Sequence, residues 1–172
     1  MCGIETTHNK KAISSGAENL NNEMYGKYLT FWSDRQLFGV PIFNVQQIVT
    51  IEKITGVPDF PDYAKGIINL RGSIIPIIDM RLRFHKKEIP YNERTCIIVT
   101  HIKNNLIGIA VDAVDEVTMI EDGNISGPPK VTRNDNYDYL TGIAKIKNKA
   151  VLLLNAEKIF SSDEAGSFAE VS

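Results

Sequence analysis

The sequence predicts an all-β protein made of two small five-stranded barrels packed together, with short helices. Two observations support this prediction. The chain repeats itself once, and each copy of the repeat divides into about five short apolar segments separated by turn residues. Closing such segments into a barrel removes the unpaired strand edges that a small open sheet would leave. One continuous sandwich of ten strands is the alternative arrangement of the same segments.

The repeat emerges when the chain is slid along itself without gaps. An offset of 69 residues sets 37–40 on 106–109, an offset of 71 sets 54–58 on 125–129, and an offset of 76 sets 66–67 on 142–143. Apolar residues and turn residues fall in the same order in both copies. The second copy is longer by seven residues, which fall in the polar stretch 130–139, where a surface loop tolerates insertion.

Each copy is expected to contain a β-hairpin, a third strand, a loop with Gly and Pro, a second hairpin and a short helix. Asp79 and Asn155 follow the second hairpins and are good helix N-caps, so they predict helices over 80–84 and 156–160. Turn residues capable of the positive φ that tight hairpins need mark the four hairpins, at 33–36, 71–72, 103–105 and 147–148.

These elements place the first barrel at about 25–90 and the second at about 91–161. The prediction allows the two barrels to exchange their end segments with each other. Residues 1–24 and 162–172 are predicted to be flexible tails.

Composition narrows the classes of function. The chain has 172 residues, with 19 Lys and Arg against 21 Asp and Glu, so its net charge of −2 argues against nucleic acid as a partner and disfavours membrane-surface binding. No apolar run approaches the roughly 18 residues of a membrane helix, so no membrane insertion is expected. Cys2 and Cys96 show no C-x-x-C spacing, which suggests a reducing cytoplasm without disulfide or zinc site.

Motifs for catalysis are lacking in the sequence. It contains no nucleophile elbow, P-loop, dinucleotide-binding or H-E-x-x-H pattern, and its three histidines have no ligand-like spacing, so neither an enzyme nor a cofactor or metal site is predicted. One acidic cluster lacks the order of an EF-hand and is interpreted as a solvated charged face: Asp112, Asp115, Glu116, Glu121 and Asp122.

Arg71 is the most informative polar residue of the second hairpins. Both hairpin tips are basic, but only the first carries an arginine, whose rigid fork of donors suits carboxylates and carbonyl groups of a partner. An ordinary exposed turn cation is an equally good interpretation from spacing alone.

A longer stretch carries a family resemblance. Residues 57–81, with the sequence VPDFPDYAKGIINLRGSIIPIIDMR, resemble the signature of the CheW family, the adaptor of bacterial chemotaxis arrays. The match continues through 38–40, 45–48, 108–112 and 139–142, and covers about 27–161.

The resemblance implies two SH3-like barrels, no catalysis, and a cytoplasmic adaptor that couples chemoreceptor tips to the regulatory domain of the histidine kinase CheA. It also implies partner binding by Arg71, in a hairpin shaped by Gly66 and Gly72. Further family positions tied to partner binding are Val45, Gly108, Val114 and Val117; for the valines, simple core packing is the competing interpretation. Many members carry glutamate where this chain has Gln47, so its receptor specificity is expected to differ.

The leading hypothesis is a scaffold, monomeric in isolation and able to join rings in arrays. It would bind receptors in a groove between the barrels near Val45, Gln47 and Arg71, and the kinase through barrel ends. A scaffold of another chemosensory-type pathway is the nearest alternative. A different class of function is a small-molecule-binding or catalytic protein that uses the groove between the barrels.

Overall fold

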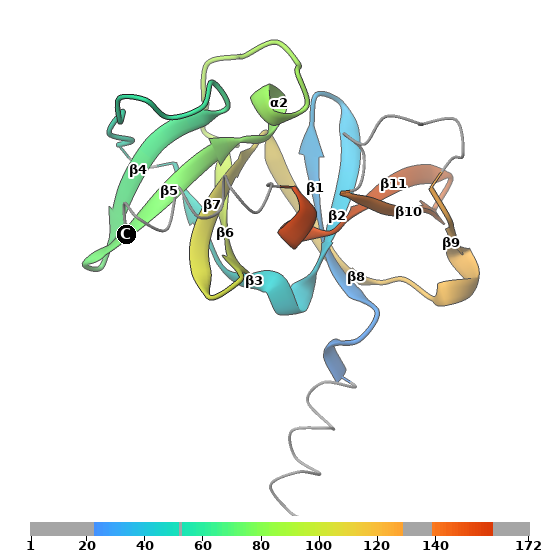
Figure 1. Cartoon of the computed structure of the whole chain (residues 1–172). Helices are drawn as coiled ribbons and strands as arrows, with labels where there is room; N and C mark the ends of the chain where they lie inside the picture. The colour runs from blue at the N-terminus through green and yellow to red at the C-terminus, as the bar shows by residue number, and fades with distance from the viewer. Residues whose placement is uncertain (1–22, 52, 129–138, 160–172) are drawn as a thin grey trace, which may run out of the picture.

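The computed structural model describes residues 23–51, 53–128 and 139–159 (Figure 1). The predicted tails and the insertion at 130–139 therefore lie largely outside the described residues. In chain order the strands are β1 (Lys27–Ser33), β2 (Gln36–Pro41), β3 (Val45–Thr50), β4 (Ala64–Leu70), β5 (Ser73–Asp79), β6 (Cys96–Ile102), β7 (Asn105–Val111), β8 (Ala113–Met119), β9 (Ile125–Ser126), β10 (Leu140–Ile146) and β11 (Lys149–Leu154). The short helices are α2 (Met80–Arg83) and the 3₁₀ turns η1 (Ile42–Asn44), η2 (Asp122–Asn124) and η4 (Ala156–Lys158).

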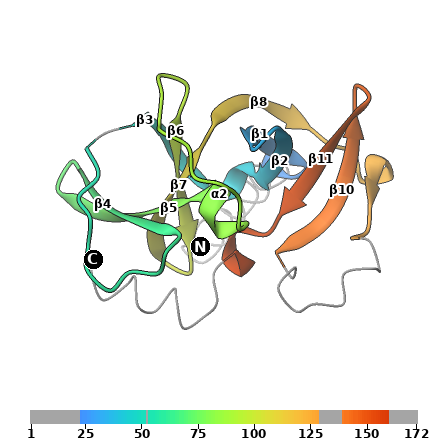
Figure 2. The same ribbon diagram turned by 90° about the horizontal axis from the view of Figure 1, so that it is seen from above.

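The strands form two sheets, which stand side by side when the molecule is seen from above (Figure 2). One sheet has the order β3-β6-β7-β5-β4 and is called here the five-stranded barrel. The other has the order β8-β1-β2-β11-β10-β9 and is called the six-stranded barrel. The predicted all-β fold with two SH3-like barrels is confirmed. The sixth strand is the two-residue β9.

Each barrel closes because one stretch of chain reaches both edges of its sheet. In the five-stranded barrel, β3 pairs with β6 at one edge, and Thr55 pairs with Ile67 of β4 at the other. The two backbone hydrogen bonds between Thr55 and Ile67 are both 2.9 Å long. In the six-stranded barrel, β8 pairs with β1 and the following β9 pairs with β10. The edges that an open sheet would expose are thereby covered.

The two repeats exchange their first hairpins. Hairpin β6–β7 belongs to the second copy but lies between β3 and β5, whereas hairpin β1–β2 of the first copy lies between β8 and β11. Asp112 alone separates β7 from β8, and a single residue cannot turn a strand back on its neighbour, so the chain runs on into the other barrel. The limits 25–90 and 91–161 therefore describe the repeats, and each barrel draws on both.

All four hairpins turn through two residues with positive φ, as their turn residues predicted. The residue pairs, with their φ angles, are Asp34 and Arg35 at 48° and 63°, Arg71 and Gly72 at 52° and 88°, Lys103 and Asn104 at 47° and 68°, and Lys147 and Asn148 at 47° and 64°. Two consecutive residues of this kind match the twist of the flanking strands.

The two predicted N-caps are confirmed. A side-chain oxygen of Asp79 accepts a hydrogen bond from the Leu82 amide at 3.2 Å, and Asn155 accepts one from the Glu157 amide at 3.0 Å. Helix α2 ends at Arg83, one residue earlier than predicted. The second element is a 3₁₀ turn over Ala156–Lys158, and residue 160 of the predicted helix lies outside the described part of the chain.

The hydrophobic core has three parts. Each barrel has its own cluster, around Ile75 and Ile97 in one and around Val151 and Leu153 in the other. A third cluster takes residues from both barrels and is called the shared core. Its members include Leu29, Phe31, Phe38, Val40, Ile78, Ile98, Ile107, Ile109 and Leu154. The exchanged hairpins thus bury apolar surface between the barrels. No helix of the described residues is long and apolar enough to cross a membrane.

Candidate functional site

Arg83 of α2 contacts residues of both barrels. Its Nε donates a hydrogen bond to the carbonyl oxygen of Ile159 at 2.7 Å. Its guanidinium carbon lies 5.4 Å from the centre of the Tyr63 ring and 5.9 Å from that of Tyr139. An offset of 76 residues relates Tyr63 to Tyr139 and also Arg83 to Ile159. Equivalent residues of the two repeats therefore meet here, as expected at an approximate twofold axis.

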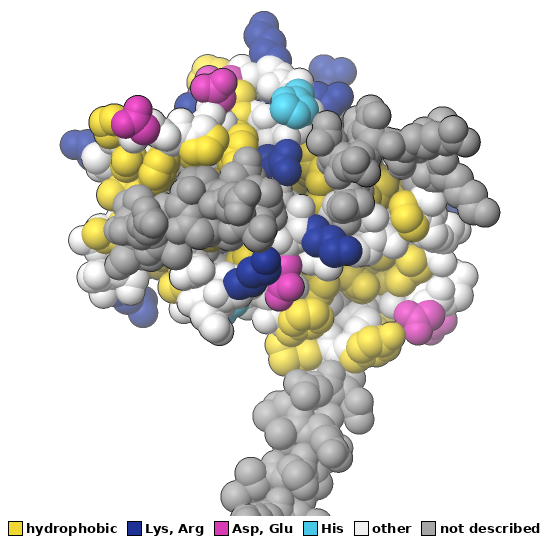
Figure 3. Space-filling model, viewed as in Figure 1, with side chains coloured by type: hydrophobic (Ala, Val, Ile, Leu, Met, Phe, Trp, Pro, Cys, Tyr) yellow, Lys and Arg dark blue, Asp and Glu magenta, His cyan; other side chains and the backbone are white. Residues whose placement is uncertain are grey.

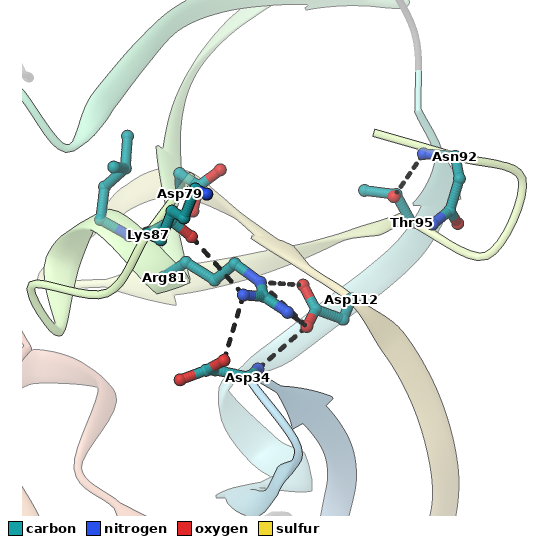
Figure 4. Close-up of polar contacts among 8 residues, drawn as sticks. Asp34, Asp79, Arg81, Lys87, Asn92, Thr95 and Asp112 are labelled. Carbon is teal, nitrogen blue, oxygen red and sulfur yellow. Dashed lines mark hydrogen bonds and ion pairs between the residues drawn. The ribbon is translucent and has the colours of Figure 1, made fainter. Parts of the chain in front are cut away.

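Beside this axis, Arg81 joins the two barrels through an ionic cluster, called here the interbarrel clamp and made of Arg81, Asp112 and Asp34 (Figure 4). Arg81 Nη2 lies 2.7 Å from Asp112 Oδ2, Arg81 Nε lies 2.9 Å from Asp112 Oδ1, and Arg81 Nη1 lies 3.2 Å from Asp34 Oδ1. The hydrogen bond to Asp112 is the main cause that raises the pKa of Arg81 above its ordinary value, so the guanidinium stays charged.

Asp112 is held by backbone contacts as well. Its Oδ2 accepts a hydrogen bond from the Asp34 amide at 2.9 Å, and its own amide donates to the Trp32 carbonyl at 3.0 Å. The side chain is only 25% exposed. The interpretation of the acidic cluster as a solvated face is therefore wrong for Asp112, because this carboxylate is the acceptor that ties β8 to the β1–β2 hairpin and to α2.

The equivalent positions in the other half of the molecule carry no such clamp. The offsets relate Arg81 to Glu157, Asp34 to Lys103 and Asp112 to Phe43. Within residues 23–51, 53–128 and 139–159, neither Glu157 nor Lys103 forms an ion pair. Phe43 is 63% exposed. The two sides of the approximate axis are therefore chemically different: one is tied by charges, and the other presents an aromatic ring to solvent.

A pocket of about 460 Å³ lies next to the clamp, between the β1–β2 hairpin and the end of α2. Phe38, Phe84 and Tyr139 line it, and the ring of Phe84 lies 5.1 Å from each of the other two rings. This is the groove in which the ligand-binding alternative would be tested. No group of three or more His, Cys, Asp or Glu side chains that could hold a metal ion occurs among the described residues.

Arg71 occupies the exposed tip of hairpin β4–β5. Thr55 pairs antiparallel with Ile67, so the tip, four residues beyond Ile67, points toward the end of β3 near Thr50. Val45 begins the same strand, five residues earlier, which at about 3.3 Å per residue places it roughly 16 Å from Thr50. Arg71 and Val45 thus flank β3 from opposite ends and do not share one compact pocket.

The three glycines among the predicted site residues have different surroundings. Gly66 is buried with a φ of +139°, and a β-carbon there would lie 2.0 Å from the Thr55 carbonyl oxygen. Gly72 completes the exposed turn with a φ of +88°, and a β-carbon there would meet nothing. Gly108 lies in β7, where a β-carbon would lie 2.5 Å from Ile77 Cδ1. Gly66 and Gly108 are thus enclosed by the five-stranded barrel.

The predicted site residues of β3 and β8 differ in exposure. Val45 and Val114 are half-buried and pack against the shared core, in agreement with the packing interpretation of these valines. Val117, by contrast, is 54% exposed, and its equivalent in the first repeat, Ile48, is 43% exposed. Gln47 is half-buried. The structure thus places apolar side chains on the outer surface of the third strand of both barrels.

Sequence reasoning missed several exposed apolar residues. Met119 is 56% exposed on the same face of β8 as Val117, and Tyr25 is 67% exposed close by, since Gly26 and Ile120 share a backbone hydrogen bond. We call Val117, Met119 and Tyr25 the β8 patch. Hydrophobic side chains gather at the lower edge of the molecule in Figure 3, where η1 and the lower end of β8 lie. The positions of Val117 and Met119, two residues apart in a strand, could have predicted that both side chains lie on one face of β8.

Comparison with known proteins agrees with this architecture. A family model described as CheW-like domain matches residues 27–164. The chain belongs to the CheW family. It is 33% identical to the chemotaxis protein CheW of Klebsiella aerogenes, over 95% of this chain and 93% of the relative. It is 30% identical to that of Helicobacter pylori, over 90% of this chain and 93% of the relative.

A solved structure supports the same assignment. The scaffolding protein TtCheW from Thermoanaerobacter tengcongensis is 35% identical and gives a TM-score of 0.74, with 81% of this chain and 94% of that chain covered. The function of this CheW family member is therefore that of an adaptor in chemotaxis.

Proposed function

We propose that this CheW family member is a non-enzymatic cytoplasmic adaptor that couples chemoreceptor tips to the regulatory domain of the histidine kinase CheA. One observation carries the proposal: each barrel exposes its own large apolar side chains, which are typical of protein-binding surfaces. The five-stranded barrel presents Arg71 and Ile48, and the six-stranded barrel presents the β8 patch. A bridge needs two separate surfaces, because both partners must be bound at the same time.

The receptor side is assigned to β3 and the hairpin tip beside it. On β3, Ile48 is exposed while Val45 and Gln47 are half-buried, and Arg71 stands exposed at the other end of the strand. A helical segment of a partner lying along β3 would reach from Val45 to Arg71, since the strand is about as long as three helical turns. Gln47 contributes amide hydrogen bonds there without charge.

The kinase side is assigned to the β8 patch at the end of the six-stranded barrel. Val117 and Met119 are more than half exposed, and large apolar side chains gathered on one face of a strand mark interaction surfaces in soluble proteins. Val114 supports this face from below through its contact with the shared core. Contacts of this kind, repeated in both barrels, also allow assembly into rings.

The receptor side is tested by matched charge reversals at the two hairpin tips. Arg71→Glu should weaken capture of the receptor tip while leaving the thermal unfolding curve nearly unchanged, because the side chain is exposed. Lys147→Glu is the control, since Lys147 occupies the equivalent tip of the other barrel. Equal binding by both variants would contradict the role of Arg71.

The bridge itself is tested by offering both partners together. An adaptor holds the receptor tip and the kinase domain in one complex, detectable by size-exclusion chromatography with light scattering. If the partners displace one another, they share one surface and the bridge is wrong.

A further inference from the structure

The interbarrel clamp ties together the two surfaces assigned to the partners. Arg81 is the second residue of α2, which directly follows β5, the strand that begins next to the Arg71 tip. Asp112 is the residue directly before β8, which carries Val117. A bidentate contact between Arg81 and Asp112 thus connects the hairpin of one barrel to the strand of the other.

We propose that Arg81 and Asp112 are positioning residues, which fix the angle between the barrels and so hold the two partner surfaces in the orientation that a ternary complex needs. This inference rests on the proposed function. It assigns the clamp no contact with either partner.

The chemistry of the clamp suits this role. The shared core joins the barrels through aliphatic and aromatic side chains, and the hydrophobic effect that drives their burial is not directional. A guanidinium held by a carboxylate through two parallel hydrogen bonds has a defined plane and distance. Arg81 is only 14% exposed and also reaches Asp34, so the hairpin tip, the crossing strand and α2 are held at one point.

The lack of a second clamp makes the arrangement one-sided. The other crossing between the barrels runs through η1, where Asn44 makes a long 3.5 Å contact with the His101 carbonyl. Glu157 and Lys103 stand at the positions equivalent to Arg81 and Asp34 without pairing with each other. The structure describes two crossings of the chain between the barrels. Only the crossing at Asp112 has an ion pair that restrains movement of one barrel against the other.

The first test measures the angle between the barrels without any partner. In the full chain with Cys2 and Cys96 replaced by serine, spin labels at Lys103 and Lys147 report one distance between the hairpin tips of the two barrels. Arg81→Gln and Asp112→Asn should broaden this distance distribution, whereas Glu157→Gln, at the position equivalent to Arg81, should leave it unchanged. Arg81→Lys keeps the charge but not the fork, and should broaden the distribution if Arg81→Gln fails to fold.

The second test uses the kinase regulatory domain and a receptor tip. The clamp variants should bind each partner alone with the affinity of the wild type, and the affinity for the second partner in the presence of the first should fall by about five- to tenfold. Unchanged distance distributions, or broadened distributions with an intact ternary complex, would overturn the inference. If the wild type itself binds only one partner, the proposed function fails, and the spin-label distances alone decide whether the clamp positions the barrels.

Discussion

Arg83 and Ile159 occupy equivalent positions in the two repeats, and they touch: Arg83 Nε donates a 2.7 Å hydrogen bond to the Ile159 carbonyl. A residue beside a twofold axis meets its own equivalent, so this contact marks where the two copies are joined. The residues themselves differ, because a cation on one side is paired with a carbonyl on the other. The join is therefore made by two chemically different residues at equivalent positions of the repeat.

The first prediction concerns the stability of this join. Arg83→Ala removes a charged hydrogen bond and the contact with two tyrosine rings, and should lower the free energy of unfolding by about 2 kcal/mol. Chemical denaturation of the variant and of the wild type measures this change in the free energy of unfolding. The control is Arg94→Ala, because Arg94 is exposed and its side chain forms no hydrogen bond or ion pair with the described residues, so its effect should stay within about 0.5 kcal/mol. Equal effects at both positions would mean that Arg83 does not hold the barrels together.

The second prediction separates two glycines that the family resemblance places together. Gly66→Ala should destabilise the protein by about 3 to 5 kcal/mol, because its β-carbon would lie 2.0 Å from the Thr55 carbonyl oxygen at a positive φ. Gly72→Ala should cost only about 1 to 2 kcal/mol, because its turn is open and only the φ is unfavourable. Comparable melting temperatures for the two variants would contradict a role for Gly66 in closing the barrel.

The four hairpins and the two N-caps could be predicted because each depends on residues close together in the chain, and the repeat could be predicted because equivalent residues recur in the same order at nearly constant offsets. The clamp could not, since Arg81 and Asp112 are 31 residues apart and Asp34 is 47 residues from Arg81. The sequence shows Asp112 only as one member of the acidic cluster. It does not show that Asp112 is the single residue between two strands or that it faces Arg81. The exposure of Val117 was equally hidden, because a valine in a strand looks the same on either face until the pairing is known.

The third prediction tests Gly108, which the resemblance ties to partner binding. Gly108→Ala should lower the free energy of unfolding by about 1 to 3 kcal/mol, because the new methyl group would approach Ile77 Cδ1 to 2.5 Å and Ile97 Cγ2 to 2.8 Å. Its effect on partner capture should become smaller when Ile77→Val removes the Cδ1 contact in the same chain. Lost binding in a double variant of normal stability would instead indicate direct contact.

The fourth prediction is a loss of stability at alkaline pH. Burial, with a hydrogen bond of 2.7 Å to Asp79, raises the pKa of Tyr91 above its ordinary value. Tyrosine in the unfolded chain titrates at about pH 10, so above that pH Tyr91 ionises in the unfolded chain while it stays neutral in the folded protein, and stability falls as the pH rises. In urea unfolding between about pH 8 and 11, the free energy of unfolding should decline less steeply with pH in Tyr91→Phe than in the wild type. Tyr25→Phe, at an exposed position, should leave the slope unchanged.

The fifth prediction is that replacing Arg71 raises the stability of the protein but weakens its binding of partners. Its φ of 52° is a conformation that asparagine adopts more readily than arginine, and an Asn-Gly pair is the preferred two-residue hairpin turn. Arg71→Asn should therefore raise the free energy of unfolding by about 0.5 to 1 kcal/mol while weakening partner capture. Lys147→Asn makes the same exchange at the equivalent tip and should stabilise without affecting binding. A stabilised Arg71→Asn variant that still captures both partners would show that the arginine is an ordinary turn cation.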